Sequence, residues 1–264
     1  MKLLTLNCHS WQEENQIEKM KYLAEVIVQE GYDIIALQEV NQLIADKIVY
    51  SDVRESNFAY ILCEELKKIG VIYNFVWDYH HIGYDVFHEG TGILFKGEIE
   101  EHISDFIGTS KDTNFWKSRK FTMISQSIGE EIVDFYSCHL GWWNDSDNSF
   151  EKQVDDLLKF ANERGNRYFL MGDFNNDANV RGEGYDYLLE RGLRDTYSYA
   201  LKSDDGVTVP GAIAGWEGKC NASKRIDFIL SNRDELKIKS SEVIFNGKNR
   251  DVISDHFGVA VETF

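Results

Sequence analysis

Short apolar runs alternate with amphipathic segments from the first residues of the chain onward. The run KLLTL at 2–6 predicts a strand, and DIIALQ at 33–38 predicts a second, buried strand. Between them, residues 15–31 repeat apolar positions at helical spacing and end at Gly31, which is typical of a helix C-terminus. The chain therefore opens with a strand, a helix and a strand.

The rest of the chain is rich in strand-like segments. Residues 149–165 predict a helix with Ser149 as N-cap and Gly165 after its end, and another helix is expected within 56–70. Runs rich in β-branched and aromatic residues predict strands at 71–79, 91–96, 121–128, 131–140, 166–174, 225–232, 240–245 and 257–264. Strands clustered between helices favour two packed sheets with helices outside, an α/β sandwich that forms one domain over 1–264.

Composition narrows the function classes. The 264 residues carry a formal net charge of -17, and an acidic surface disfavours a general nucleic-acid binder. The four cysteines form no CxxC pair, so neither a zinc knuckle nor a disulfide framework is indicated. The apolar run before Asn7 is too short for a secretory signal, and no later run reaches membrane-span length. We therefore expect a cytoplasmic protein with no membrane association, and no obligate protein partner is evident.

Polar groups able to bind metal or transfer protons stand at the ends of the predicted strands. They are Asn7, Glu39, His139, Asp173, Asn175 and Asp227, and the C-terminal SDHFG adds Asp255 and His256. Each alone has an ordinary interpretation, because an Asp or Asn caps turns and a His bonds backbone carbonyls. The whole set is harder to explain in that way, since burying several carboxylates together is costly without a cation or a proton partner.

The chemistry open to such a set is restricted. Oxygen ligands with few soft donors favour Mg²⁺, with Mn²⁺ as an alternative, and Glu39 and Asn7 suit that role. A histidine with a carboxylate behind it keeps one tautomer and can contact or protonate an oxyanion; Asp227 with His256 is the candidate pair. The set predicts a metal-dependent phosphoester hydrolase in which water attacks phosphorus in line.

These residues lie in motifs that resemble a known family. The motifs LNCHS, LQEV, SCHLG, GDFNN, RIDFIL and SDHFG follow the order and approximate spacing of the endonuclease/exonuclease/phosphatase superfamily. The resemblance implies a four-layer α/β/β/α sandwich of two packed mixed sheets with outer helices, with the site at one end of the paired sheets. It also implies a catalytic loop at GDFN, in which Asp173 positions or deprotonates water and Asn175 holds the scissile phosphate.

The same resemblance implies a metal shell. Glu39 resembles the principal metal ligand, with Asn7 beside it, and Asp255 resembles either a further ligand or an orienting carboxylate. His9 is a departure, because it stands near the position where many abasic-site enzymes carry an acidic residue. The metal ligands near His9 are therefore expected to differ from those of the abasic-site enzymes.

Further residues are assigned to the phosphate by resemblance. His256, supported by Asp227, resembles the histidine on the phosphate, and His139 resembles the second histidine of the DNase and sphingomyelinase branches. Arg119 is a candidate to hold substrate phosphate, and Glu89 is a candidate to orient His139. For both Arg119 and Glu89 the alternative is a solvated surface position.

The substrate has two main interpretations. A nuclease needs several Lys or Arg contacts to phosphates, and the basic residues here are dispersed. A small-molecule phosphatase is favoured by aromatic, His and Asp residues interleaved at 77–92 and 139–145, where Trp142 and Trp143, together with Trp216, are candidates to bind a sugar ring. These stretches look similar to a Gram-positive subgroup that includes maltose-6'-phosphate phosphatase. A sphingomyelinase-like phosphodiesterase and a catalytically silent binding module are further alternatives.

Overall fold

The computed structural model describes residues 1–211, 213 and 222–264, and most strands in these residues belong to two mixed sheets. The seven-stranded β1 sheet runs in the order β12 (Ala200–Ser203), β14 (Ile238–Ile244), β15 (Gly258–Thr263), β1 (Lys2–Asn7), β2 (Ile34–Leu43), β6 (Phe87–Phe95) and β5 (Asn74–Gly83). The six-stranded β10 sheet runs in the order β11 (Arg194–Asp195), β13 (Asp227–Ser231), β10 (Arg167–Asp173), β9 (Glu131–His139), β8 (Arg119–Ile128) and β7 (Glu101–Ile107). A small hairpin pairs β3 (Ile48–Tyr50) with β4 (Val53–Arg54).

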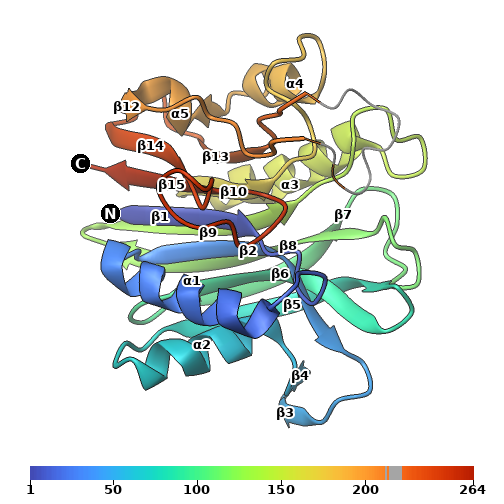
Figure 1. Cartoon of the computed structure of the whole chain (residues 1–264). Helices are drawn as coiled ribbons and strands as arrows, with labels where there is room; N and C mark the ends of the chain where they lie inside the picture. Colours follow the sequence, from blue (N-terminus) through green and yellow to red (C-terminus); the bar gives the residue numbers. More distant parts are fainter. Residues whose placement is uncertain (212, 214–221) are drawn as a thin grey trace.

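Helices cover the outer faces of the two sheets (Figure 1). They are α1 (Gln16–Glu30), α2 (Phe58–Lys68), α3 (Phe150–Arg164), α4 (Gly184–Glu190) and the short α5 (Thr196–Tyr199). The helices α1 and α2 pack on the β1 sheet, while α3 and α4 pack on the β10 sheet. This order of layers confirms the predicted α/β/β/α sandwich.

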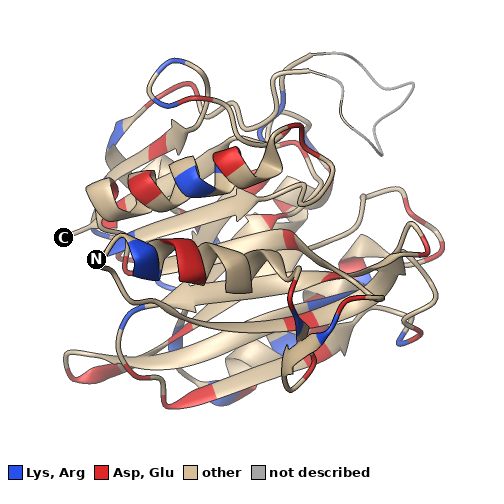
Figure 2. Ribbon diagram, turned by 60° about the horizontal axis from the view of Figure 1, so that its bottom comes forward, with Lys and Arg blue, Asp and Glu red and all other residues tan. Residues whose placement is uncertain are grey.

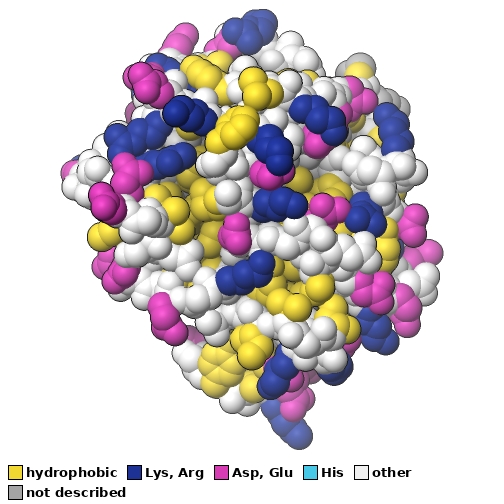
Figure 3. Space-filling view, turned by 90° about the vertical axis from the view of Figure 1, so that its left-hand side faces the viewer, with side chains coloured by type: hydrophobic (Ala, Val, Ile, Leu, Met, Phe, Trp, Pro, Cys, Tyr) yellow, Lys and Arg dark blue, Asp and Glu magenta, His cyan; other side chains and the backbone are white. Residues whose placement is uncertain are grey.

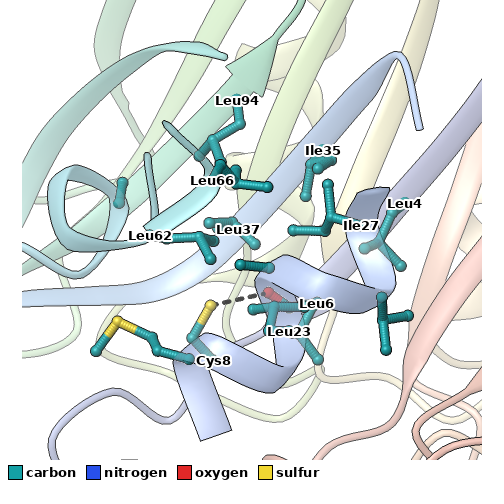
Figure 4. Packing of buried hydrophobic residues seen from close by; sticks show 14 of the residues in the cluster. Leu4, Leu6, Cys8, Leu23, Ile27, Ile35, Leu37, Leu62, Leu66 and Leu94 are labelled. Atoms are coloured by element: carbon teal, nitrogen blue, oxygen red, sulfur yellow. Dashed lines mark hydrogen bonds between the residues drawn. The ribbon is translucent and has the colours of Figure 1, made fainter. Parts of the chain in front are cut away.

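Three buried apolar layers hold the sandwich together. One lies between the two sheets, one between the β1 sheet and its helices, and one between the β10 sheet and its helices. Figure 4 shows the second of these layers, where Leu23 of α1 lies near Leu6 of β1 and Leu62 of α2 lies near Leu37 of β2. Because central strands bury side chains on both faces, they appear in the sequence as continuous apolar runs.

Several predicted boundaries agree with the structure. Gly31 and Gly165 follow α1 and α3 with left-handed φ angles of 74° and 73°, which glycine adopts without steric cost. The Ser149 hydroxyl accepts a hydrogen bond from the Lys152 backbone N–H and caps α3 as predicted. The edge strand β7 was not predicted, because its mostly exposed sequence EHISDFI lacks an apolar run.

Charged residues are spread over helices, strands and loops (Figure 2). Figure 3 shows the end of the molecule where β1 begins, and on this face Lys and Arg are interspersed with Asp and Glu. Among the described residues, no helix has both the length and the apolar character needed to cross a bilayer.

Candidate active site

Sheet topology brings the polar strand ends together. β1 runs parallel to β2, and β9 runs parallel to β10, so the carboxyl ends of each pair lie at a common edge. β15, β6 and β13 are antiparallel neighbours of these strands and begin at that edge. In the β10 sheet the register places Asp173 beside His139 on one side and beside Asp227 on the other. Residues predicted from separate strand ends are thus neighbours.

A cavity of about 490 Å³ opens at this edge and is called here the active-site cavity. The predicted site residues that line it are Glu39, Glu89, Arg119, His139, Trp142, Asp173, Asn175, Asp255 and His256. Asn7 and Asp227 stand behind this wall, each hydrogen bonded to residues that line the cavity. The lining also includes residues that were not predicted, among them His9, Gln12, His81, Tyr84 and Trp116.

Asn7 connects the two sheets at the bottom of the site. Its Nδ2 donates to Glu39 Oε1 at 2.9 Å and to Asp173 Oδ2 at 3.2 Å. Its Oδ1 accepts from the His9 backbone N–H at 3.1 Å. The amide therefore fixes the positions of two carboxylates that come from different sheets.

Glu39 reaches the cavity through a local irregularity in β2. The register between β2 and β6 shifts between Leu37 and Val40, and Glu39 has a positive φ of 50°, which is uncommon for a residue other than glycine. Such a bulge re-aims a side chain at the end of a ladder. Burial, and next the negative charge of Asp255, raise the pKa of Glu39, so a nearby cation would favour its charged form.

Asp173 is held by the turn that follows β10. Its Oδ1 accepts the Asn175 backbone N–H at 2.8 Å, and Asn175 Nδ2 donates to the Leu140 carbonyl at 3.0 Å. The preceding Gly172 has a φ of 156°, and a Cβ there would lie 1.8 Å from the Cys138 carbonyl oxygen. Only glycine therefore allows the strand to approach β9 so closely before the turn. Burial raises the pKa of Asp173 to about 7.

His256 and Asp227 form the predicted pair. His256 Nδ1 lies 3.0 Å from Asp227 Oδ2, and both side chains are buried. The other ring nitrogen, Nε2, lies 3.8 Å from Asp173 Oδ2. Burial alone lowers the pKa of a histidine, but the charges of Asp227 and Asp173 outweigh burial and hold the pKa of His256 well above its ordinary value.

His139 lies on the other side of Asp173 in a different environment. Its Nε2 is 3.7 Å from Asp173 Oδ2, and its Nδ1 is buried with no hydrogen-bond partner among the described residues. Burial, and next the positive charge of Arg119, hold the pKa of His139 well below its ordinary value. His139 is therefore a neutral imidazole near pH 7.

Arg119 is buried rather than solvated at the surface. The side chain is 2% exposed and lines the cavity. Its Nη1 donates to the carbonyls of Trp116 and Ser118 at 3.0 and 3.1 Å, and its Nε has no partner among the described residues. Burial lowers the pKa of Arg119, but an arginine stays charged near neutral pH. The arginine thus presents a buried positive charge to the cavity.

Glu89 contacts His81, whereas the sequence suggested that it would orient His139. Glu89 Oε1 lies 3.3 Å from His81 Nε2. The register of β5 against β6 shifts between Tyr79 and His81, and this bulge accounts for the place of His81 at the cavity. Burial raises the pKa of Glu89 to about 8 and lowers that of His81 to about 3. The pair is therefore predominantly uncharged near pH 7.

His9 joins a charged network beside Asp255. His9 Nδ1 lies 2.7 Å from Glu13 Oε1 and 3.7 Å from Asp255 Oδ1, and Glu13 also bonds Lys19 Nζ at 2.6 Å. Potential ligand atoms of His9, Glu13 and Asp255 lie within 4.8 Å of one another. In the described part of the chain, the other group with this property is Asp173, Asp227 and His256. Both groups bring ligand atoms close enough for one metal ion, but in the second group the proton stabilised on His256 by Asp227 and Asp173 favours proton transfer over metal binding.

The tryptophans predicted to bind substrate occupy different places. Trp142 lines the cavity, and its ring centroid lies 6.0 Å from that of Trp116, a half-exposed residue that was not predicted. Trp143 instead packs with the apolar layer under α3, where its ring is 5.6 Å from Tyr187. Trp216 lies outside the described residues.

Two of the unpredicted lining residues, His81 and Trp116, share one property. His81 lies within a strand, and Trp116 lies in the loop before β8, so neither follows the carboxyl end of an apolar run. The interleaved His and aromatic residues at 77–92 were the available signal for His81. Trp116 had no comparable signal beyond its closeness in sequence to Arg119.

Several solved structures are similar in fold to this chain. An endonuclease/exonuclease/phosphatase family protein from Leptotrichia buccalis shares 40% sequence identity with this chain. The match covers 100% of this chain and 99% of that protein, with a TM-score of 0.93. A mannosyl-6-phosphatase from Bacteroides thetaiotaomicron shares 15% identity over 100% and 99% of the two chains, with a TM-score of 0.68. Truncated TDP2 from Caenorhabditis elegans shares 18% identity over 100% and 96%, with a TM-score of 0.62. The last two likenesses show the fold alone.

Sequence comparison identifies the family. No curated protein sequence matches the chain significantly. Residues 5–256 match the model described as the Endonuclease/Exonuclease/phosphatase family, a range that contains the predicted catalytic and metal-binding residues. The maltose-6'-phosphate subgroup is not identified by these matches. The chain therefore belongs to the endonuclease/exonuclease/phosphatase family, whose members hydrolyse phosphoesters and generally depend on a divalent metal.

Proposed function

We propose that this protein is a Mg²⁺-dependent phosphatase that removes phosphate from a small phosphorylated sugar, similar in kind to maltose 6'-phosphate. The observation that carries the proposal is Arg119, a buried cation that lines the same cavity as Glu39 and Asp173. A buried charge is costly to leave unpaired, and the Arg119 Nε has no partner among the described residues, so an anion that reaches Arg119 gains a strong interaction. A phosphate bound between Arg119 and a cation on the carboxylate side satisfies both groups.

The metal site is assigned to Glu39, Asn7 and Asp255. Carboxylate and amide oxygens fit Mg²⁺, or Mn²⁺ as an alternative, and Asn7 Nδ2 already holds Glu39 in place. When bound, the cation supplies charge stabilisation to the phosphoryl oxygens. Asp255 is either a direct ligand or orients its neighbours through the network with His9.

The remaining residues act on water and phosphate. Asp173, with a pKa raised by burial to about 7, takes a proton from the attacking water as the new P–O bond forms. Asn175 holds the phosphate beside it. His256 carries a proton near neutral pH and gives it to the oxygen that leaves as the old P–O bond breaks, with Asp227 fixing its ring. Neutral His139 donates a hydrogen bond to the phosphate.

The substrate class rests on charge and on the aromatic lining. The chain carries a net charge of -17, so it repels a polyanionic nucleic-acid duplex. Salt screens this repulsion beyond about 8 Å but does not supply the row of Lys and Arg side chains that a duplex needs for binding. A sugar monophosphate brings only about two charges, close to those of a phosphorylated residue. Trp142 and Trp116 present ring surface to the same cavity, which suits the apolar face of a sugar. The mannosyl-6-phosphatase with this fold is compatible with the assignment.

A phosphate-release screen tests the proposal. Purified protein with Mg²⁺ is assayed against sugar phosphates, nucleotides, inositol phosphates and plasmid DNA. We expect higher kcat/KM for phosphorylated sugars than for DNA, and a loss of at least ~10²-fold in Glu39→Gln, comparable to removing one group that stabilises the transition state. The matched control Glu25→Gln, on the exposed side of α1, should retain full activity.

Two outcomes would contradict the proposal. Full sugar-phosphate hydrolysis after treatment with chelator would exclude the metal. Plasmid nicking at physiological salt, with sugar phosphates untouched, would replace the phosphatase with a nuclease.

A further inference from the structure

Two buried amide side chains, Asn148 and Gln153, bond the segments around the active-site cavity without being among the described residues that line it. Asn148 stands two residues before α3, and Gln153 lies near the start of that helix. Leaving a buried amide unpaired is costly, so its hydrogen-bond partners show what it holds in place. Nothing in the phosphate chemistry described above uses either residue.

Asn148 bonds both ends of the loop 108–118 between β7 and β8, which is called here the arginine loop because Arg119 follows it. At the start of the loop, Asn148 Oδ1 accepts from the Thr109 backbone N–H at 2.9 Å. At its end, Asn148 Nδ2 donates to the Lys117 carbonyl at 2.6 Å. A Cβ at Gly108 would lie 2.2 Å from Asn148 Oδ1, so a larger residue there would displace the amide. One side chain therefore joins the two ends of the arginine loop.

The bond to Lys117 bears directly on Arg119. The carbonyls of Trp116 and Ser118, on either side of Lys117, accept the hydrogen bonds from Arg119 Nη1. A guanidinium binds phosphate well only when its planar fork is aimed at the phosphate oxygens. Because Asn148 holds the middle carbonyl of these three, it fixes the peptide segment that aims Arg119.

Gln153 connects Asn148 with the segment that follows β9. Its Nε2 donates to the Asn148 carbonyl at 2.7 Å, and its Oε1 accepts from the Gly141 backbone N–H at 2.9 Å. The residue before Gly141 is Leu140, whose carbonyl accepts from Asn175 Nδ2 at 3.0 Å. A backbone N–H only donates and a carbonyl only accepts, so these partners determine which way the amide of Gln153 faces. Gln153 therefore links the arginine loop to the segment that bonds Asn175.

We propose that Asn148 and Gln153 are positioning residues for phosphate binding, which together set the place of Arg119 relative to Asn175. This inference rests on the proposed function, in which Arg119 and Asn175 both hold the phosphate. Neither amide touches the substrate. Asn148 bonds the arginine loop alone, whereas Gln153 acts on both segments, through Asn148 and through Gly141. Removing either amide should therefore weaken phosphate binding more than it slows the chemical step, whereas a role in stability alone would lower Tm and leave phosphate affinity unchanged.

The test measures binding and turnover separately. Calorimetric titration with inorganic phosphate in the presence of Mg²⁺ gives Kd, and kcat and KM are measured on the best sugar phosphate of the screen described above. In Asn148→Ser the Kd for phosphate and the KM should both rise ~10-fold, on the order of one hydrogen bond to a charged group, with a smaller change in kcat. Gln153→Met, which has a side chain of similar length but makes neither bond, should have at least as large an effect.

Asn232 provides a matched control at the opposite end of β10 from the cavity. Its Oδ1 accepts from the Tyr168 backbone N–H at 2.9 Å, and its Nδ2 donates to the Asn166 carbonyl at 3.0 Å, the same pair of bond types that Asn148 makes. Asn232→Ser should lower Tm and leave the Kd for phosphate unchanged. Comparing it with Asn148→Ser separates a general loss of stability from a loss of positioning.

A double-mutant cycle tests whether Asn148 acts through Arg119. In Arg119→Gln the group that Asn148 aims is gone, so adding Asn148→Ser should change the Kd for phosphate by less than about twofold. Adding Gln153→Met to Arg119→Gln should still weaken binding, because the segment that bonds Asn175 is also disturbed.

Two results would overturn the positioning role while the phosphatase stands. One is an equal Kd for phosphate in the wild-type protein and Asn148→Ser, and the other is an undiminished effect of Asn148→Ser in the Arg119→Gln background. A wild-type protein that neither binds phosphate nor hydrolyses any sugar phosphate would overturn the proposed function itself.

Discussion

His256 and His139 are buried on either side of the same carboxylate, yet their environments favour opposite charge states. Their Nε2 atoms lie 3.8 and 3.7 Å from Asp173 Oδ2. Behind His256 stands the Asp227 carboxylate, which raises its pKa against the effect of burial. Beside His139, burial and the Arg119 charge act in the same direction and lower its pKa.

The difference shows that the two histidines are suited to different roles in the reaction. Similar burial and similar distances to Asp173 do not give the two histidines similar pKa values. The charge of a further neighbour, Asp227 for His256 and Arg119 for His139, decides whether the protonated or the neutral ring is stable. One histidine keeps a proton that can be transferred, and the other stays neutral beside a fixed cation. Pairs of titratable groups whose environments push their pKa values apart are a common basis for assigning acid and base roles.

Removing the support of His256 should have the largest effect. In Asp227→Asn the charge that stabilises the imidazolium is gone, so kcat should fall by ~10²- to 10⁴-fold, the range for general acid catalysis. NMR titration of the histidine rings in metal-free protein should show that the pKa of His256 falls. Asp234→Asn, an exposed change in the loop after β13, is the control and should alter neither value. An unchanged pKa of His256 in Asp227→Asn would remove the basis of the comparison.

A change at Arg119 should have a smaller and different effect. Arg119→Lys keeps a positive charge but loses the planar fork that matches phosphate, so KM for the sugar phosphate should rise ~10-fold with a smaller change in kcat. Arg119→Gln should in addition raise the pKa of His139, because the neighbouring charge is lost. Steady-state kinetics and histidine NMR measure the two effects. Arg181→Lys, on an exposed side chain, serves as the control.

The pH dependence of stability should differ in sign for the two histidines. A His139 pKa below the unfolded value of about 6.5 means that the unfolded state binds more protons below that pH, so stability falls on acidification by at most ~1.4 kcal/mol per pH unit. A raised His256 pKa contributes stability that is fully present below about 6.5 and is lost as pH rises through the folded pKa. Urea unfolding of metal-free protein measures both.

His139→Gln should therefore flatten the stability profile between about pH 5 and 6.5, and His256→Gln should flatten it above about 6.5. Comparing slopes with the wild-type protein separates titration from any uniform loss of packing. Slopes that change in the same pH range in both variants would show that the two environments are alike.

The smallest expected effects concern the aromatic residues. Trp116→Ala should raise KM for the sugar phosphate a few-fold, on the order of one exposed ring contact, with an unchanged Tm because Trp116 is 51% exposed. Trp143 is a candidate from the sequence to bind the sugar ring, so Trp143→Ala should raise KM more than it lowers kcat. Its packing on Phe150 and Tyr187 indicates that it should also lower the free energy of unfolding, by about 2 kcal/mol. An unchanged Tm in Trp143→Ala would show that Trp143 does not stabilise the fold and acts only in binding.

The fold was largely predictable because its central strands are buried on both faces. β1 and β10 appear in the sequence as apolar runs, and α3 carries both its capping serine and its terminal glycine. The edge strand β7 and the small β3–β4 hairpin were less predictable. Both elements bury few side chains. β7 carries no apolar run, and the apolar run of β3 is only three exposed residues long, too short to predict a strand.

The site was predictable where a functional group directly follows an apolar run. Asn7 and Asp173 end strands, and parallel pairing brings such ends to one edge. Sequence patterns could not show that Glu89 meets His81, because that contact depends on a register shift between β5 and β6. Likewise Arg119 is held by the carbonyls of Trp116 and Ser118 in the loop before β8, which no local pattern records.

The hydrogen bond from Asn7 to Asp173 has a consequence for the order of folding. It joins positions 166 apart and links the two sheets, as does the bond from Ser137 Oγ to the Leu37 carbonyl across a separation of 100. Contacts between such distant segments form only after the cost of closing long loops has been met by earlier structure. Neither sheet can assemble the catalytic groups alone. A partly folded chain therefore lacks the assembled site, which forms only when the two sheets of the sandwich have docked.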